Sequence, residues 1–171
     1  LAGSALIDAS SNVGVGRAAL NADTKGTRST ALGNNALATQ NFTTATNTHN
    51  TAVGYNAGLS VTTGKNNTLV GANAGDALTT GELNVAIGDT ALGADDVGNR
   101  TVAIGYAALQ SQNFSTSTIS YNTGVGYGVG ASISTGVRNT LVGYEAGDAI
   151  TTGNQNTIMG EGAGTALTDA D

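Results

Sequence analysis

The sequence predicts an all-β protein, a β-solenoid (β-roll) of nine coils of about 17 residues each. The first observation is a glycine that follows a large apolar residue and recurs nine times at nearly constant spacing. The second is the composition, with 26 glycines among 171 residues, 11% charged residues and 4% aromatic residues. Glycine, threonine, valine and asparagine suit short strands joined by tight turns. Low charge with moderate apolar content argues against a disordered chain.

The recurring glycines divide the chain into units of two lengths. They are Gly16, Gly33, Gly54, Gly71, Gly88, Gly105, Gly126, Gly143 and Gly160, with successive spacings of 17, 21, 17, 17, 17, 21, 17 and 17 residues. Three short units and one long unit form a 72-residue super-repeat, so NTLVGANAGDALTTG (67–81) returns as NTLVGYEAGDAITTG (139–153). We therefore treat residues 1–171 as one repetitive segment, with longer loops at 38–50 and 110–122.

Each unit contains one well-marked strand before its glycine. The residue directly before the glycine is large and apolar, and the residue two positions earlier is β-branched, as in Thr68-Leu69-Val70. These two columns share one face of a strand, because strand side chains alternate. The intervening column is mostly small, as at Gly14 and Ala31, which predicts that this face also meets another surface at close range. Such a strand would be buried on both faces.

An asparagine column precedes the strands. Asparagine lies four residues before the glycine in seven units, at Asn12, Asn50, Asn67, Asn84, Asn122, Asn139 and Asn156. Stacked asparagine side chains can form hydrogen-bonded ladders along a solenoid. A 17-residue unit suits a coil of two short strands and two turns, and stacking is obligatory because a single coil leaves its edges unpaired. Nine coils at about 4.8 Å each would span about 43 Å.

Composition and charge exclude several classes of protein. The net charge of −6 and the six basic residues argue against nucleic acid as a partner. The absence of cysteine excludes a disulfide framework and thiolate metal sites, and fits an extracellular setting. No apolar run approaches about 18 residues, so we expect no membrane insertion. Because the chain begins at Leu1, we expect a fragment of a longer protein.

The sequence predicts no enzyme, cofactor or metal site. The single histidine, His49, has Tyr121 as its counterpart in the second super-repeat, a replacement that a catalytic base would not tolerate. The acidic residues are scattered rather than paired. The stretch GADD (93–96) could supply oxygen ligands to Ca²⁺, but its counterpart NADT (21–24) keeps one aspartate only.

The two four-residue inserts are the candidates for recognition. They are QNFTTATNTHN (40–50) and QNFSTSTISYN (112–122), and they contain both phenylalanines of the chain. An exposed aromatic ring among amide and hydroxyl groups suits sugar binding, so Phe42, His49, Phe114 and Tyr121 are the possible receptor contacts. The alternative is that each phenylalanine packs back onto its coil. Tyr55, Tyr106, Tyr127 and Tyr144 follow repeat glycines and are expected to form an exposed stripe or an inter-chain contact.

The strand motifs resemble two groups of trimeric fibrous proteins. NVAIGDTAL (84–92), TVAIGYAAL (101–109) and NTAVGYNAG (50–58) are similar to the N-x-V-A-I-G-x-x-A repeat of YadA-like trimeric autotransporter adhesin heads. They are equally similar to the NT-A-[IV]-G-x-x-A-G-x-x-x-TTG arrays of phage tail fibres. The resemblance covers residues 12–164, and the 17-residue unit with its TTG turn favours the fibre group. It implies a parallel homotrimer on the outside of a virion or cell, with the small column packed around the trimer axis.

The resemblance implies a structural and adhesive role. We expect a rigid extracellular shaft or head of a phage tail fibre involved in host attachment. Its expected partners are copies of itself and a host surface glycan or protein. The alternatives are the head of a bacterial trimeric autotransporter adhesin, another extracellular filament, a glycan-cleaving tailspike, and a monomeric ice-binding solenoid that uses rows of threonine such as Thr79 and Thr80.

Overall fold

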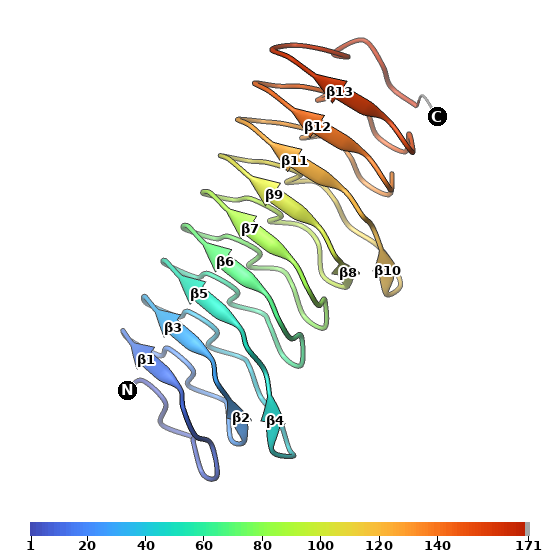
Figure 1. Cartoon of the computed structure of the whole chain (residues 1–171). Helices are drawn as coiled ribbons and strands as arrows, with labels where there is room; N and C mark the ends of the chain where they lie inside the picture. Colours follow the sequence, from blue (N-terminus) through green and yellow to red (C-terminus); the bar gives the residue numbers. More distant parts are fainter. Residues whose placement is uncertain (170–171) are drawn as a thin grey trace.

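The computed structural model describes residues 1–169 and forms a parallel β-solenoid of nine turns, without a helix in that range. The coils stack as an elongated rod with the two termini at opposite ends (Figure 1). One three-residue strand from each coil contributes to a nine-stranded sheet. These strands are β1 (Val13–Val15), β3 (Thr30–Leu32), β5 (Thr51–Val53), β6 (Thr68–Val70), β7 (Val85–Ile87), β9 (Val102–Ile104), β11 (Thr123–Val125), β12 (Thr140–Val142) and β13 (Thr157–Met159).

Strand pairing in the main sheet is parallel and keeps each repeat column in register. In β6 and β7, Thr68 lies opposite Val85 and Val70 opposite Ile87. The longer units keep the same register, since β5 pairs with both β3 and β6 in this way. The four extra residues therefore leave the sheet and do not shift it.

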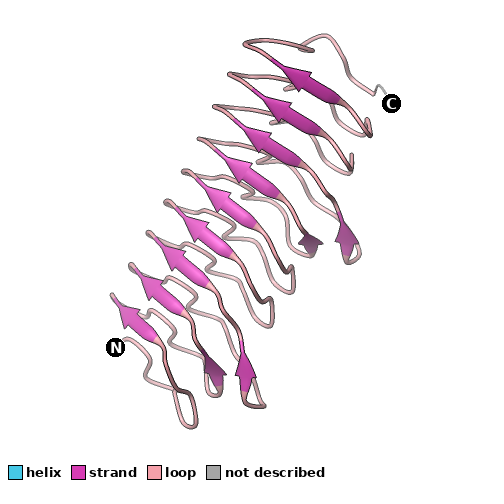
Figure 2. Ribbon diagram, viewed as in Figure 1, coloured by secondary structure: helices cyan, strands magenta, loops and turns pink. Residues whose placement is uncertain are grey.

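The back of each coil is made of turns, so the expectation of two strands per coil is wrong for most coils (Figure 2). Among residues 1–169, second strands occur only beside the inserts, where β2 (Gly26–Thr27) pairs with β4 (Thr46–Asn47) and β8 (Gly98–Asn99) with β10 (Thr118–Ile119). The physical reason is that residues two and four positions after the repeat glycine have left-handed backbone, such as Asn73 (φ 52°) and Gly75 (φ 55°). The coils remain hydrogen-bonded there, as where Gly75 N donates to Ala91 O at 2.9 Å.

The small column of the main strands faces the inside of the solenoid, and the large column faces outward. Ala52, Leu69 and Ala86 have no exposed surface, whereas Ile87 is 37% exposed and Met159 70% exposed. The expectation that the small column meets other chains is therefore wrong, because this column lines the core, and in the single chain the strand is buried on its inner face only. The interior of a coil is narrow, so its walls accept small side chains where strand and turns approach each other.

The core is filled by residues that compensate for one another along the coil. Some coils place a leucine four residues after the repeat glycine, as at Leu37 and Leu92. Other coils have glycine there and place a large side chain three residues further on, as at Leu78 and Ile133. Each coil thus contributes similar volume by one of two routes. The result is one continuous apolar core along the rod.

Candidate functional site

The repeat glycines lie where successive coils approach most closely. All nine have φ between +123° and +146°, a conformation that other residues avoid. A Cβ atom added to Gly71 would lie 2.5 Å from the carbonyl oxygen of Gly88 in the next coil. Contacts of this kind recur from Gly16 to Gly143, while the nearest atom to such a Cβ on Gly160, in the last coil, is 3.8 Å away. Their geometry is that of structural anchors.

The asparagine column forms a ladder from side chain to backbone. Asn67 Oδ1 accepts a hydrogen bond from Asn84 N at 3.0 Å, and Asn67 Nδ2 donates to Gly81 O at 2.8 Å. Asn50 makes the equivalent two bonds to Asn67 N and Gly64 O. The column residues that the structure buries are Asn50, Asn67, Asn84, Asn122 and Asn139. These side chains therefore satisfy buried backbone groups of the neighbouring coil.

A buried polar network lies at the base of each insert, and the sequence analysis did not anticipate it. Gln40 Nε2 donates to Asp23 Oδ2 at 2.6 Å, and Asn50 Nδ2 donates to Gln40 Oε1 at 2.8 Å. Asp23 also accepts a bond from Gly26 N at 2.9 Å. The network recurs in the second super-repeat, where Asp95, Gln112 and Asn122 correspond to Asp23, Gln40 and Asn50. This identity at an offset of 72 positions was the signal in the sequence that could have revealed the network.

In the second network, Gln112 Nε2 donates to Asp95 Oδ2 at 2.6 Å, and Asn122 Nδ2 donates to Gln112 Oε1 at 2.8 Å. Burial raises the pKa of the Asp95 carboxyl, and the hydrogen bonds from Gln112 and Gly98 oppose that rise. Because Asp95 is buried and bonded inward, it does not present its carboxylate to a calcium ion outside the coil. Among residues 1–169, no three His, Cys, Asp or Glu side chains group as metal ligands would.

The two phenylalanines are part of the insert structure. Phe42 is 6% exposed and Phe114 is 4% exposed. Their rings therefore offer no face for stacking on a sugar, which contradicts the expectation that they contact a receptor. The alternative, packing back onto the coil, describes both residues. The physical reason is that each insert begins with a buried glutamine, so the phenylalanine two positions later also points inward.

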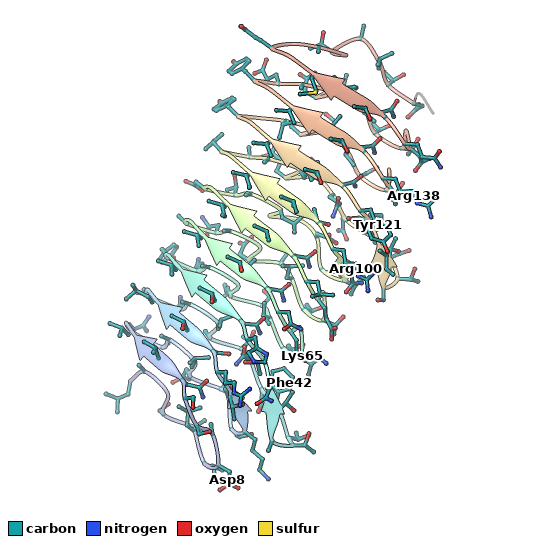
Figure 3. The ribbon with its side chains drawn as sticks, viewed as in Figure 1. Asp8, Phe42, Lys65, Arg100, Tyr121 and Arg138 are labelled. Atoms are coloured by element: carbon teal, nitrogen blue, oxygen red, sulfur yellow. The ribbon has the colours of Figure 1, made fainter. Side chains whose placement is uncertain are left out.

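His49 and Tyr121 lie on the exposed corner where the chain turns into the main strand. Both have a left-handed backbone with φ of 51°, and their column lies five residues before the repeat glycine. Tyr121 Oη accepts a hydrogen bond from Arg100 Nη1 at 2.9 Å, and the Arg100 guanidinium carbon lies 5.8 Å from the Tyr121 ring centre. Figure 3 shows Tyr121 near Arg100 and Arg138 along one edge of the rod.

The opposite edge, at the carboxyl ends of the main strands, has a tyrosine stack. The ring centres of Tyr106 and Tyr127 are 5.0 Å apart, and those of Tyr127 and Tyr144 are 5.2 Å apart. A hydrogen bond and the negative charge of Glu145 raise the pKa of Tyr144. Tyr106, Tyr127 and Tyr144 therefore form an exposed stripe in which both faces of the Tyr127 ring are covered by its neighbours, whereas Tyr55 lies outside this stack.

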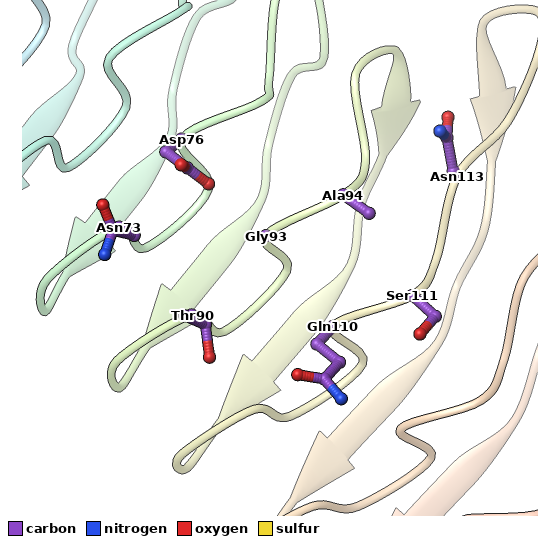
Figure 4. A pocket seen from close by; sticks show the side chains of 8 residues that line it. All are labelled: Asn73, Asp76, Thr90, Gly93, Ala94, Gln110, Ser111 and Asn113. Atoms are coloured by element: carbon purple, nitrogen blue, oxygen red, sulfur yellow. The ribbon is translucent and has the colours of Figure 1, made fainter.

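A polar depression crosses the back of the coils. It is lined by Asn73, Asp76, Thr90, Gly93, Ala94, Gln110, Ser111 and Asn113 (Figure 4). Gly93 leaves a gap between Asp76 and Gln110, and the first super-repeat has Asn21 at the equivalent position. Burial raises the pKa of Asp76. The lining offers amides, hydroxyls and one carboxylate, and it contains no base beside a nucleophile.

The outer face of the main sheet has a continuous apolar strip one residue wide, beside an outward column that is mostly threonine. The strip consists of Val15, Leu32, Val53, Val70, Ile87, Ile104, Val125, Val142 and Met159, each of them exposed or half-buried. The strip contains no polar residue over all nine coils. Exposed apolar side chains aligned in this way are typical of a protein–protein contact. Within residues 1–169 the structure has no helix of the length and hydropathy needed to cross a bilayer.

Comparisons of the chain with protein-family models, with curated proteins and with solved structures found no match.

Proposed function

We propose that the chain is a rigid structural and adhesive segment of an extracellular fibre, a shaft or head of a trimeric phage tail fibre that takes part in host attachment. The observation that carries the proposal is the exposed apolar column along the main sheet. Ile87 and Met159 illustrate it, with 37% and 70% of their surfaces exposed in the single chain. Burying such a column against further protein would release about 25 cal/mol for each Å² removed from water.

Copies of the same chain are the partner that fits this strip. The strip repeats coil by coil, so a partner of the same repeat length can place an apolar side chain at every level. Parallel copies of this chain meet that condition along the whole rod. Three copies around an axis give each strip two neighbours, and the strand motifs resemble proteins built in this way.

The hydrogen-bonding pattern supports a mechanical role. Each buried asparagine joins its coil to the next, as Asn67 does through Asn84 N and Gly81 O. The main strands add parallel backbone bonds at every level, such as Thr68 N to Asn84 O at 2.8 Å. A rod held together at each level transmits force along its axis. The proposal places the chain outside the cell, with itself and a host glycan or protein as partners, and with no catalytic function, nucleic acid or membrane insertion.

The mass of the fragment in solution tests the proposal. Light scattering should give three times the 16.7 kDa of one chain, and small-angle scattering should give an elongated particle. The variant Ile87→Lys places a charge on the strip and should yield monomers. Leu83→Lys is a matched control, because Leu83 is 46% exposed but lies in the column occupied elsewhere by arginine. A monomeric parent chain would contradict the proposal.

Three alternatives share the architecture. If the chain belongs to the head of a trimeric autotransporter adhesin or to another filament, the expected mass in solution is the same. These two alternatives differ from the proposal only in the protein to which the chain belongs. A monomeric ice-binding solenoid is favoured by the threonines of the main strands, which form an outward row at Thr30, Thr51, Thr68, Thr123, Thr140 and Thr157. The threonines of the TTG turns are less suited, because Thr79 Oγ1 already donates to Asp96 O at 3.1 Å. Thermal hysteresis at micromolar concentration of a monomer would support the ice-binding alternative.

A further inference from the structure

Positive charge is concentrated on one edge of this acidic rod. Of the six basic residues, five lie in the turns that lead into the main strands: Lys25, Arg28, Lys65, Arg100 and Arg138. We call these five residues the basic edge. The sixth, Arg17, lies at the carboxyl end of β1, on the other edge. The acidic residues Asp89, Glu145 and Glu161 also lie at that other edge, directly after the repeat glycines or one position later.

The guanidinium groups of the basic edge are available to a ligand. Arg28, Arg100 and Arg138 occupy the exposed column with left-handed backbone, at φ of 65°, 59° and 62°. Within residues 1–169, the single ion pair closer than 4.0 Å joins Lys65 Nζ and Glu82 at 3.3 Å. The three arginines therefore have no carboxylate partner within that distance. Two further acidic residues, Asp8 and Asp169, lie at the two ends of the rod, in its first and last turns.

The cations recur at every second coil. Arg28, Lys65, Arg100 and Arg138 belong to the second, fourth, sixth and eighth coils. Parallel strands lie about 4.8 Å apart, so the charges follow one another at intervals of about 10 Å along the rod. This interval is close to the length of one extended disaccharide. Duplex DNA is a poor match, because it carries one phosphate per about 1.7 Å of its axis.

A cleft on the same edge offers groups that suit a sugar chain. Thr80, Ser117 and Asn99 line it beside Arg100, and the Asn99 amide already donates to Ser117 Oγ at 3.0 Å. The lining also includes Glu82, whose carboxylate is paired with Lys65. Leu83 and Ile119 add apolar surface, and each is 46% exposed. The second insert forms one wall through β10, whose Ile119 belongs to the lining. Amides and hydroxyls can bond sugar hydroxyls, while the apolar groups can pack on the less polar faces of the rings.

We propose that the basic edge binds a linear acidic polysaccharide with one carboxylate per disaccharide, lying along the rod. Arg100 and Arg138, two coils apart, pair with successive carboxylates, Arg28, four coils from Arg100, pairs with a carboxylate two disaccharides further along, and Lys65 between them stays paired with Glu82. The cleft holds the sugar unit beside Arg100. The proposal rests on the adhesive part of the proposed function, and names the class of ligand. It requires no particular number of chains.

Binding of hyaluronan oligosaccharides tests the proposal, because they carry one carboxylate per disaccharide. Titration at low salt should show binding that weakens as salt rises, and neutral dextran of equal length should not bind. The variants Arg28→Gln, Arg100→Gln and Arg138→Gln should each weaken binding about two- to fivefold, and their combination should weaken it by at least about tenfold. Glutamine suits the column, because Gln155 occupies it with φ of 59°. Arg17→Gln, on the other edge, is the matched control.

Three results would overturn the proposal. They are the absence of hyaluronan binding, unchanged binding by the triple variant, and tighter binding of duplex DNA or of anionic lipid vesicles than of hyaluronan. The mass of each sample, measured in parallel, separates this proposal from the proposed fibre. A trimer that does not bind hyaluronan would contradict the proposed ligand and leave the proposed fibre standing. A monomer that binds hyaluronan would contradict the proposed fibre and leave the proposed ligand standing.

Discussion

The substitution Asn67→Ala should destabilise the rod by removing one rung of the asparagine ladder. Asn67 is fully buried, and its amide bonds Asn84 N at 3.0 Å and Gly81 O at 2.8 Å. Alanine leaves both backbone groups without a partner, and each such buried group costs about 1–3 kcal/mol. We therefore expect a loss of about 2–6 kcal/mol in the free energy of unfolding.

Urea unfolding at fixed protein concentration measures this loss. With a slope of about 2 kcal/mol per M, a loss of 4 kcal/mol lowers the midpoint by about 2 M. Asn113→Ala is the matched control, because the Asn113 side chain is exposed, and it should change stability by less than about 0.5 kcal/mol. A loss below about 1 kcal/mol for Asn67→Ala would refute the reasoning that the ladder holds coils together.

The near-isosteric variant Asn67→Asp separates hydrogen bonding from shape. Aspartate keeps an oxygen facing Asn84 N but replaces the donor that faces Gly81 O at 2.8 Å. The buried carboxylate has no partner for its second oxygen, so its pKa in the folded state should rise. The variant should therefore be least stable at neutral pH and should recover as pH falls, since a protonated carboxyl can donate to Gly81 O. Equal stability at pH 7 and pH 4 would contradict this account.

Three further predictions follow from the same geometry. Gly71→Ala places a Cβ 2.5 Å from Gly88 O and should cost at least about 3 kcal/mol in urea unfolding. Gly14→Ala, whose nearest contact would be 3.7 Å, should cost less than about 1 kcal/mol. Deleting residues 67–83 should remove one coil and leave a shorter rod by small-angle scattering, whereas deleting 67–74 should unfold or aggregate the chain; equal behaviour would contradict the coil register. Burial raises the pKa of Asp95 above 3.8, so protonation of Asp95 should increase the free energy of unfolding as the pH falls from 7 through that raised pKa. The variant Asp95→Asn should therefore flatten the dependence of the urea midpoint on pH.

The repeat made much of the architecture predictable. Equal spacing forces equivalent residues into columns, so Gly71 and Gly88 meet at the same level of neighbouring coils, as do Asn67 and Asn84. The four extra residues of each long unit had to leave the main sheet. In the first long unit, the insert forms β4, which pairs with β2 outside that sheet. These conclusions need only the spacing and the rule that parallel strands pair in register.

The candidate site was predictable only in part. The shared column of His49 and Tyr121 follows from their spacing before the repeat glycines, but the burial of Phe42 depends on the network that Asp23 and Gln40 form beneath it. Their spacing of 17 places Asp23 and Gln40 in one column of neighbouring coils, but it does not show that this column faces the inside of the solenoid. The arginines of the basic edge were visible in the sequence, yet their common edge appears only when the coils are stacked.

The sequence by itself determined the period, the strand in each coil, the glycine contacts and the asparagine column, because these depend on spacing along the chain. Only the tertiary structure decided which face of the main strand is inside. Alternation in a strand separates two faces without saying which is buried, so Leu69 and Val70 could have exchanged roles. The turns after each glycine settle the matter, because their left-handed residues carry the chain across the Leu69 side. That choice leaves Val70 and its column outward, and the apolar strip on which the proposed fibre depends is its consequence.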